Sequence, residues 1–216
     1  FLNRSNVYFK LMANIDLTEF IEDEWPGQGW MPIGTSSTPF KGILNGNGKT
    51  IKGLWIKRSN YAGLFAATNG ATISNLTLEA KVEGGNYVGT IVGSGKTTTI
   101  SGCRVSGEVK GNNRVGGFAG DESVTFSSCE STANVTATGQ YCGGLIGYSC
   151  SNISESSSSD NIIIGTDYVG GLVGTSIDHD IQQCYFWGKI KGDSYVGGLI
   201  GYKIAKASMN RNNHYW

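Results

Sequence analysis

Hydrophobic residues recur in this chain in short segments that end in glycine and return at a nearly constant spacing. Five copies begin at Tyr87, Arg114, Tyr141, Tyr168 and Tyr195, and a degenerate first copy, which ends in Ala67, begins at Tyr61. Their starting positions step by 26 once and then by 27 four times. A repeat of nearly constant length indicates a solenoid, in which each repeat forms one coil and contacts only its neighbours.

A second set of apolar positions lies between these segments and alternates with polar residues. In one repeat the apolar residues are Leu76, Leu78, Ala80 and Val82. A period of two residues predicts a β-strand with one buried face, whereas no 3.6-residue period appears and the glycine content opposes helices. We therefore predict an all-β protein, a right-handed parallel β-helix or β-solenoid of about 27-residue coils.

The first glycine of each segment is present in all six copies and is expected to form a turn. These turn glycines are Gly63, Gly89, Gly116, Gly143, Gly170 and Gly197. In one copy Val169 and Leu172 are both apolar but three residues apart, so they cannot both face inward on one straight strand. We expect the glycines between them to bend the chain, with a positive φ at one position.

The chain is predicted to form one continuous domain. Residues 1–57 are assigned to N-terminal entry coils and a cap, and residues 58–216 to the solenoid repeats. The stretch 19–30 is acidic, contains Pro26 and breaks the repeat pattern. We expect it to be a loop or cap that covers the open end of the solenoid.

The tyrosines that start the segments form the candidate binding strip. If Val169 faces inward, Tyr168 faces outward, so the equivalent rings should form an external ladder. These residues are Tyr61, Tyr87, Tyr141, Tyr168 and Tyr195, with Arg114 interrupting them. A strip of this kind suits a sugar or a protein partner, and the alternative is that the rings only stabilise the sheet by stacking.

The five cysteines show no metal-ligand spacing. Cys103 and Cys129 occupy one inward position in adjacent coils, where a disulfide is geometrically permitted. The preferred alternative is two small buried thiols. Cys142 and Cys150 could close a short loop, and the same alternative applies to them.

Charge and composition exclude several classes of function. The 17 basic and 17 acidic residues give no net charge, so no nucleic-acid partner is expected. No apolar run is long enough to cross a bilayer as a helix, so no membrane span is expected. Acidic residues are scattered; Asp167 and Asp193 fit turn caps better than catalysis, and the motif Asp178-His179-Asp180 fits a surface loop better than a metal site. We expect no cofactor, no metal and no enzymatic activity.

The segment endings resemble a known bacterial repeat, the GLUG motif. The endings that carry the resemblance are Gly144–Gly147, Gly171–Gly174 and Gly198–Gly201, and the entry segments Trp30–Gly34 and Asn45–Ile51 add to it. GLUG repeats occur in bacterial surface proteins, including adhesin-like proteins and the non-catalytic region of IgA-cleaving peptidases. The resemblance covers nearly the whole chain and implies a β-solenoid on a secreted or surface-anchored protein, with no chemistry of its own.

This sequence departs from the GLUG pattern at several positions. Leu64 and Thr90 stand where a second glycine is usual, and Ala119 stands where an aliphatic residue is usual. The run Ser156–Ser159 places polar residues near the core of one coil.

Three functions remain open from the sequence. The first is an extracellular or cell-surface scaffold or adhesion module that presents a rigid rod to a glycan or protein. The second is a subunit that self-associates through its solenoid ends, such as 214–216, into a filament. The third is an accessory region of a larger secreted peptidase.

Overall fold

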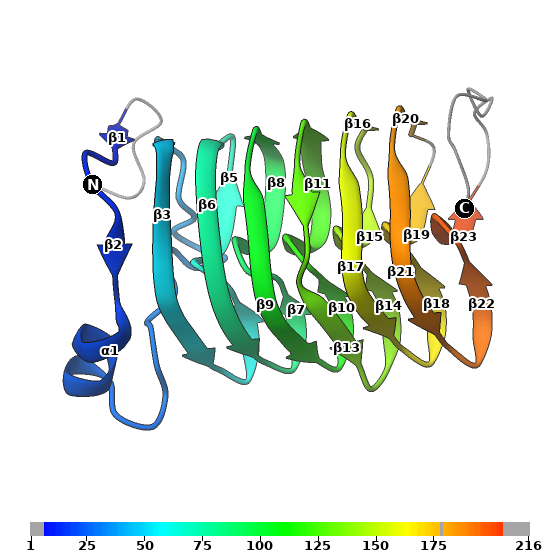
Figure 1. The fold of residues 1–216 in the computed structure, drawn as a ribbon, viewed down its shortest axis with the longest axis horizontal. Helices are drawn as coiled ribbons and strands as arrows, with labels where there is room; N and C mark the ends of the chain where they lie inside the picture. The colour runs from blue at the N-terminus through cyan, green and yellow to red at the C-terminus, as the bar shows by residue number, and fades with distance from the viewer. Residues whose placement is uncertain (1–6, 178, 205–216) are drawn as a thin grey trace.

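The computed structural model describes residues 7–177 and 179–204, so residues 214–216 and Asp178 lie outside the described part. The chain forms coils that stack side by side along the longest axis, with the first and last strands at opposite ends (Figure 1). Each regular coil contributes one short strand to a six-stranded sheet and its other strands to a 17-stranded sheet. This is the parallel β-solenoid that the sequence predicts, with coils of about 27 residues.

One sheet of six strands carries the segment starts. Its strands are β4 (Asn60–Ala62), β7 (Asn86–Val88), β10 (Asn113–Gly116), β14 (Gln140–Gly143), β18 (Asp167–Gly170) and β22 (Ser194–Gly197). Their register is parallel, and Val88, Val115, Cys142 and Val169 are partners from coil to coil. The repeat read from the sequence is therefore the repeat of the backbone pairing.

A second, 17-stranded sheet wraps around the rest of each coil. The strands on the face nearest the viewer in Figure 1 are β3 (Ile43–Lys57), β6 (Thr72–Glu83), β9 (Arg104–Gly111), β13 (Asn134–Ala137), β17 (Ser157–Ile164) and β21 (Tyr185–Lys191). We call this surface the front face. The two-residue strand β12 (Glu130–Ser131) pairs between β9 and β17.

The remaining strands of the 17-stranded sheet complete the coils. They are β1 (Tyr8–Lys10), β2 (Ile15–Asp16), β5 (Phe65–Asn69), β8 (Val92–Ser101), β11 (Ala119–Ser127), β15 (Ile146–Ser149), β16 (Ile153–Ser154), β19 (Val173–Ile177), β20 (Ile181–Gln182) and β23 (Ile200–Ile204). Ile73, Ile100, Phe126 and Ile153 stack in register between neighbouring coils and are almost fully buried. Burying a side chain of this size contributes about 1.5–3 kcal/mol, so these inward ladders supply much of the stability.

The stretch that breaks the repeat caps the first coil, as the sequence indicates, and it includes a short helix. Helix α1 (Thr18–Glu24) packs on β3 through Ile21, which is 1% exposed. The segment after it is tied to β3 by the bonds from Trp30 N to Trp55 O (2.7 Å) and from Lys57 N to Gln28 O (2.8 Å). Figure 1 shows α1 at the N-terminal end of the stack. Strand β3 pairs along most of its length with β6.

The turn glycines lie where the sequence places them, but the expected positive φ is wrong. None of the six has φ in the left-handed region; that conformation is adopted two positions earlier, by Tyr61, Tyr87, Arg114, Tyr141, Tyr168 and Tyr195, with φ between 51° and 66°. Glycine is required for another reason. A Cβ on Gly143 would lie 2.2 Å from Ile146 O, and one on Gly170 would lie 2.0 Å from Val173 O. The chain folds back so closely on itself that no side chain fits.

The run Ser156–Ser159, which departs from the repeat pattern, places polar residues in the core of one coil. Ser156 and Ser158 are buried in one coil, where Cys129 and Ser131 stand in the coil before. Ser156 Oγ donates to Ser154 O (2.7 Å) and accepts from Cys129 N (3.1 Å). A Cβ on Gly144 would lie 2.1 Å from Ser158 Oγ, so the second glycine and the small serine make room for each other.

Candidate functional site

The tyrosine ladder exists as an external row along the six-stranded sheet. It consists of Tyr61, Tyr87, Arg114, Tyr141, Tyr168 and Tyr195. Tyr61 and Tyr87 stack with ring centroids 4.7 Å apart and planes within 5°. Tyr141, Tyr168 and Tyr195 form a second stack with centroid separations of 5.1 and 4.8 Å. Val169 is fully buried beside the partly exposed Tyr168, which confirms the expected directions of the two side chains.

Arg114 joins the two stacks. Its guanidinium carbon lies 5.5 Å from the Tyr87 ring centroid and 5.7 Å from that of Tyr141, distances that permit cation–π attraction to both. Arg114 Nη1 also pairs with the carboxylate of Asp121, whose side chain is only 2% exposed. Burial alone would lower the pKa of Arg114, but the charge and hydrogen bond of Asp121 raise it above its usual value.

Two further tyrosines, which the sequence analysis did not include, pack on the ladder from the neighbouring strands. Tyr148 on β15 lies edge-on to Tyr141 at 5.5 Å and has the Arg114 guanidinium over its ring at 4.5 Å. Tyr202 on β23 lies edge-on to Tyr168 and Tyr195. The seven-residue spacing from Tyr141 to Tyr148 and from Tyr195 to Tyr202 was the available signal.

The stacking determines which parts of the ladder rings a partner can contact. Rings about 4.8 Å apart cover each other's faces, so a sugar cannot lie flat on the inner rings. The edges and hydroxyl groups stay accessible, and within the described part of the chain no hydrogen bond engages a ladder hydroxyl. The ladder is therefore a row of hydrogen-bonding groups, and its stacking also stabilises the sheet.

Every ladder residue holds a strained backbone conformation. A left-handed φ costs a residue with a Cβ about 1–2 kcal/mol, and bulky residues adopt it rarely. A second row of residues with left-handed φ lies at another corner of the coils. It consists of Asn75, Gly102, Ser128, Glu155 and Gln183. At that corner the residues are small or flexible and polar, whereas the ladder corner carries rings, whose stacking offsets part of the cost.

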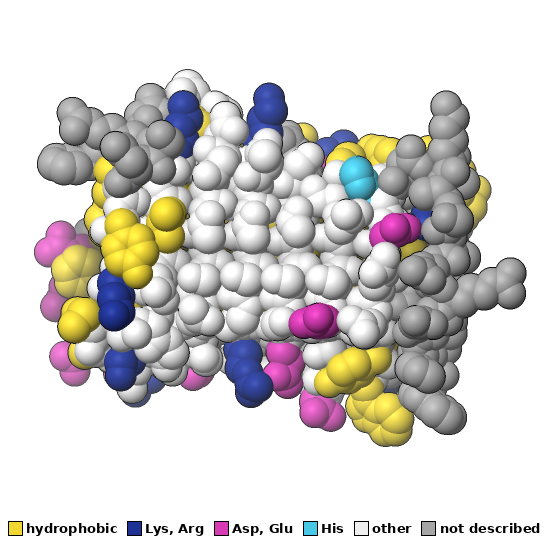
Figure 2. Space-filling view, turned by 90° about the horizontal axis from the view of Figure 1, so that it is seen from above, with side chains coloured by type: hydrophobic (Ala, Val, Ile, Leu, Met, Phe, Trp, Pro, Cys, Tyr) yellow, Lys and Arg dark blue, Asp and Glu magenta, His cyan; other side chains and the backbone are white. Residues whose placement is uncertain are grey.

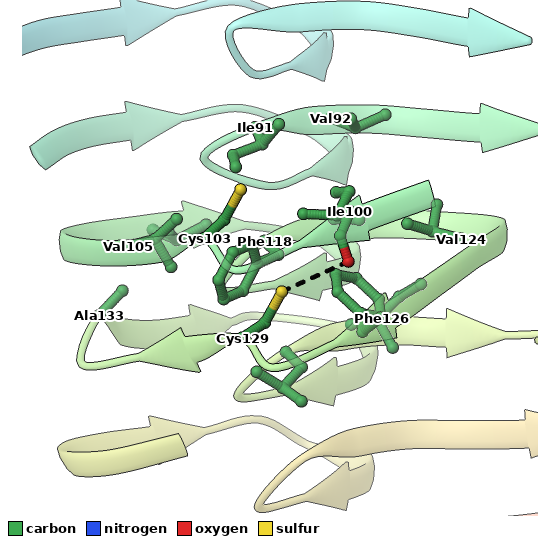
Figure 3. Close-up of a cluster of buried hydrophobic side chains, with 14 of the residues drawn as sticks. Ile91, Val92, Ile100, Cys103, Val105, Phe118, Val124, Phe126, Cys129 and Ala133 are labelled. Atoms are coloured by element: carbon green, nitrogen blue, oxygen red, sulfur yellow. Dashed lines mark hydrogen bonds between the residues drawn. The ribbon is translucent and has the colours of Figure 1, made fainter. Parts of the chain in front are cut away.

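The predicted cysteine pair lies in the core as free thiols. Cys103 and Cys129 stand one coil apart among Ile91, Phe118 and Phe126, and the Cys129 thiol donates to Ile100 O at 3.4 Å (Figure 3). Burial raises the pKa of Cys103 to about 11 and that of Cys129 to about 12, so both are protonated at neutral pH. Cys142 and Cys150 are also free thiols. A disulfide in oxidised protein stays a prediction.

The front face carries an aromatic surface that the sequence analysis missed. On β21 Tyr185 is 49% exposed and Trp187 is 62% exposed, and on β17 Ile162 and Ile164 are also exposed. Figure 2 shows backbone and uncharged polar groups over most of the top of the stack, with hydrophobic side chains gathered at its lower right margin, toward the C-terminal end. The alternation of Phe186, Gly188 and Ile190 already placed Tyr185 and Trp187 outward.

Trp187 borders a shallow hollow in this face. The hollow has a volume of about 670 Å³, and its lining includes Asn134, Asp160, Ile162, Trp187, Gly188 and Lys189. We call it the Trp187 hollow. No ring stacks on the indole among the described residues, so its arrangement differs from that of the ladder.

Metal-ligating side chains are scattered over the described part of the chain. Of the residues that the structure describes, no three His, Cys, Asp or Glu side chains are grouped so that they could hold a metal ion. His179 lies in a loop, where its carbonyl accepts from Lys203 Nζ at 3.5 Å. No helix in the described ranges is long and apolar enough to cross a membrane.

Comparisons with known proteins support the fold. The crystal structure of a "putative immunoglobulin A1 protease" from Bacteroides ovatus superposes with a TM-score of 0.76. The match covers 92% of this chain and 67% of that one at 22% sequence identity. At that identity the likeness shows a shared β-solenoid and nothing about activity.

Two relatives share sequence with parts of the chain. Halomucin of Haloquadratum walsbyi is 44% identical over 97 residues, and a "Putative Gly-rich membrane protein" of Evansella cellulosilytica is 40% identical over 74 residues. The matches cover 42% and 33% of this chain, but only 1% and 8% of those proteins. No protein-family model matches the chain. The comparisons do not name the GLUG motif, so that resemblance stays a prediction.

Proposed function

We propose that the chain is a non-enzymatic scaffold or adhesion module, outside the cell or on its surface, that presents a rigid rod to a glycan or protein. The observation that carries this proposal is the unbroken register of the six-stranded sheet. Equivalent residues from β4 to β22 lie in one row, which gives the rod a long, repetitive side. Solenoids use such extended surfaces for binding.

The surroundings of the ladder support this role. The ladder hydroxyls and the neighbouring amides form parallel rows: Asn86 Nδ2 donates to Asn60 Oδ1 and Asn113 Nδ2 donates to Asn86 Oδ1, each at 3.0 Å. Uncharged groups of this kind suit a partner with many hydroxyls or amides. The names of the two relatives, halomucin and a Gly-rich membrane protein, support an external location.

The filament is the second candidate, and one observation favours it. Val196 in the last described coil is 44% exposed, whereas its partner Val169 is fully buried. An apolar, unpaired edge can pair with another chain. At the other end, however, α1 and the segment after it cover β3, which opposes direct head-to-tail stacking.

Electron microscopy across a range of concentrations, followed by glycan and protein arrays, tests the proposal. We expect discrete rods at all concentrations and saturable binding to at least one array component, with no cleavage of the bound component. Fibres that lengthen with concentration, without binding to either array, would replace the scaffold by self-assembly. Release of fragments from a bound component would show an enzyme. The third candidate, an accessory region of a peptidase, would be favoured by a peptidase domain in the same polypeptide.

A further inference from the structure

The outward positions of the front face change in character along the stack. One row runs through Glu83, Lys110 and Thr136 and then reaches Ile164. Another runs through Arg104 and Glu130 and ends at Ser157 and Tyr185. The earlier coils thus carry charged pairs, such as Arg104–Glu130 at 3.4 Å, whereas the last two add exposed apolar side chains beside Lys189 and Lys191. Such a local change on one face marks a binding surface.

A β-bulge places a carboxylate beside Trp187. The register between β17 and β21 shifts between Ser159 and Asn161, so Asp160 is the additional residue, with φ at 52°. Bulges redirect side chains and often lie next to functional sites. Asp160 is exposed and forms no salt bridge with another described residue.

The other residues around the indole supply hydrogen-bond donors, and Gly188 leaves space beside the ring. Asn134 Oδ1 accepts from Ile162 N at 2.9 Å, which orients the amide, and its NH₂ group has no hydrogen bond within the described ranges. Lys189 adds an ammonium group. A Cβ on Gly188 would lie 2.6 Å from Asn161 O, so this position carries no side chain next to the ring.

We propose that the Trp187 hollow binds one or two units of a neutral oligosaccharide. A pyranose has a C–H face that can lie against the free indole face, and hydroxyls that need both acceptors and donors. Asp160 provides the acceptor, and Asn134 and Lys189 provide donors. The volume of about 670 Å³ falls within the range of small-ligand sites.

This inference rests on the proposed scaffold function and assigns it a ligand class and a site. The probes are neutral hexasaccharides of glucose, mannose, galactose and xylose, measured by calorimetry and by quenching of tryptophan fluorescence. The variants are Trp187→Ala, Trp187→Phe and Asp160→Asn in the full chain. Phe20→Ala, on α1 at the far end of the rod, is the matched aromatic control, and Tyr61→Ala tests the ladder separately. The urea midpoint of each variant checks folding.

We expect at least one hexasaccharide to bind, with affinity reduced about tenfold or more in Trp187→Ala. Trp187→Phe should retain part of the affinity, Asp160→Asn should lose several-fold, and Phe20→Ala should bind like the unchanged protein. Binding that survives Trp187→Ala but is lost in Tyr61→Ala would overturn the inference and leave the scaffold function standing. Failure to bind any of these sugars also overturns it, and arrays then decide whether a protein is the partner.

Discussion

The tyrosine ladder and the Trp187 hollow are both aromatic surfaces, but they use their rings in opposite ways. In the ladder the stacked rings lie about 5 Å apart, so their faces contact the rings of neighbouring coils and are covered by them. At the hollow the indole is 62% exposed and its equivalent one coil earlier is the small Ser159. The regular repeat therefore builds stability, and the interruption of the repeat leaves a ring available for a ligand.

The largest effect is expected at a turn glycine beside the ladder. Gly143→Val should reduce the free energy of unfolding by about 3 kcal/mol or more, because the new Cβ would lie 2.2 Å from Ile146 O. Gly48→Ala is the control, since Gly48 has φ of 69° with no atom near its Cβ position. It should cost only about 1 kcal/mol for the left-handed backbone. Equal losses in urea denaturation would contradict the close-approach explanation.

The next effect concerns the single cation of the ladder. Arg114→Tyr would complete the row of rings but leave the buried carboxylate of Asp121 without its guanidinium, at a cost of about 3 kcal/mol. The double variant Arg114→Tyr with Asp121→Ser copies the preceding coil, where Tyr87 and Ser94 hold these positions. It should recover most of the loss in urea unfolding. A double variant as unstable as the single one would show that Arg114 acts through the rings.

A direct comparison of the two surfaces should give a smaller difference. Tyr141→Ala removes one stacked ring, one edge contact and one cation–π contact, so it should cost about 2 kcal/mol. Trp187→Ala removes an exposed ring and should change stability by no more than about 0.5 kcal/mol. Urea unfolding of both variants tests this order, and the reverse order would assign the structural role to Trp187.

Acidification should affect the cap. The hydroxyl of Thr18, then Lys52 and the Thr18 amide, lower the pKa of Asp16 from 3.8 to about 2. Because the pKa of Asp16 is lower in the folded state, the ionised carboxylate stabilises the fold. This stabilisation is present above pH 3.8 and is lost as the pH falls toward 2. NMR titration should find the low value, and Thr18→Ala should raise it more than Lys52→Ala. Equal pKa values in all three proteins would contradict the assignment.

The sequence predicts the fold because the repeat is expressed twice, in the glycine spacing and in the alternation of residues such as Leu76 and Leu78. It also places the ladder tyrosines outward. It does not reveal that Tyr168 holds the left-handed turn, because a bulky residue is the least expected there and only contacts between coils stabilise it. The hollow depends on the bulge at Asp160, and register shifts between strands leave no regular sequence pattern.

The stacking of coils about 27 residues long also determines how the rod should respond to force. Each coil adds roughly 5 Å to the rod but holds roughly 90 Å of extended chain, at about 3.4 Å per residue. Tension along the axis would separate one coil at a time, because each is bonded only to its neighbours. A cell-surface tether of this design would lengthen in even steps under load and absorb work at each one, so that its outermost contacts experience less sudden strain.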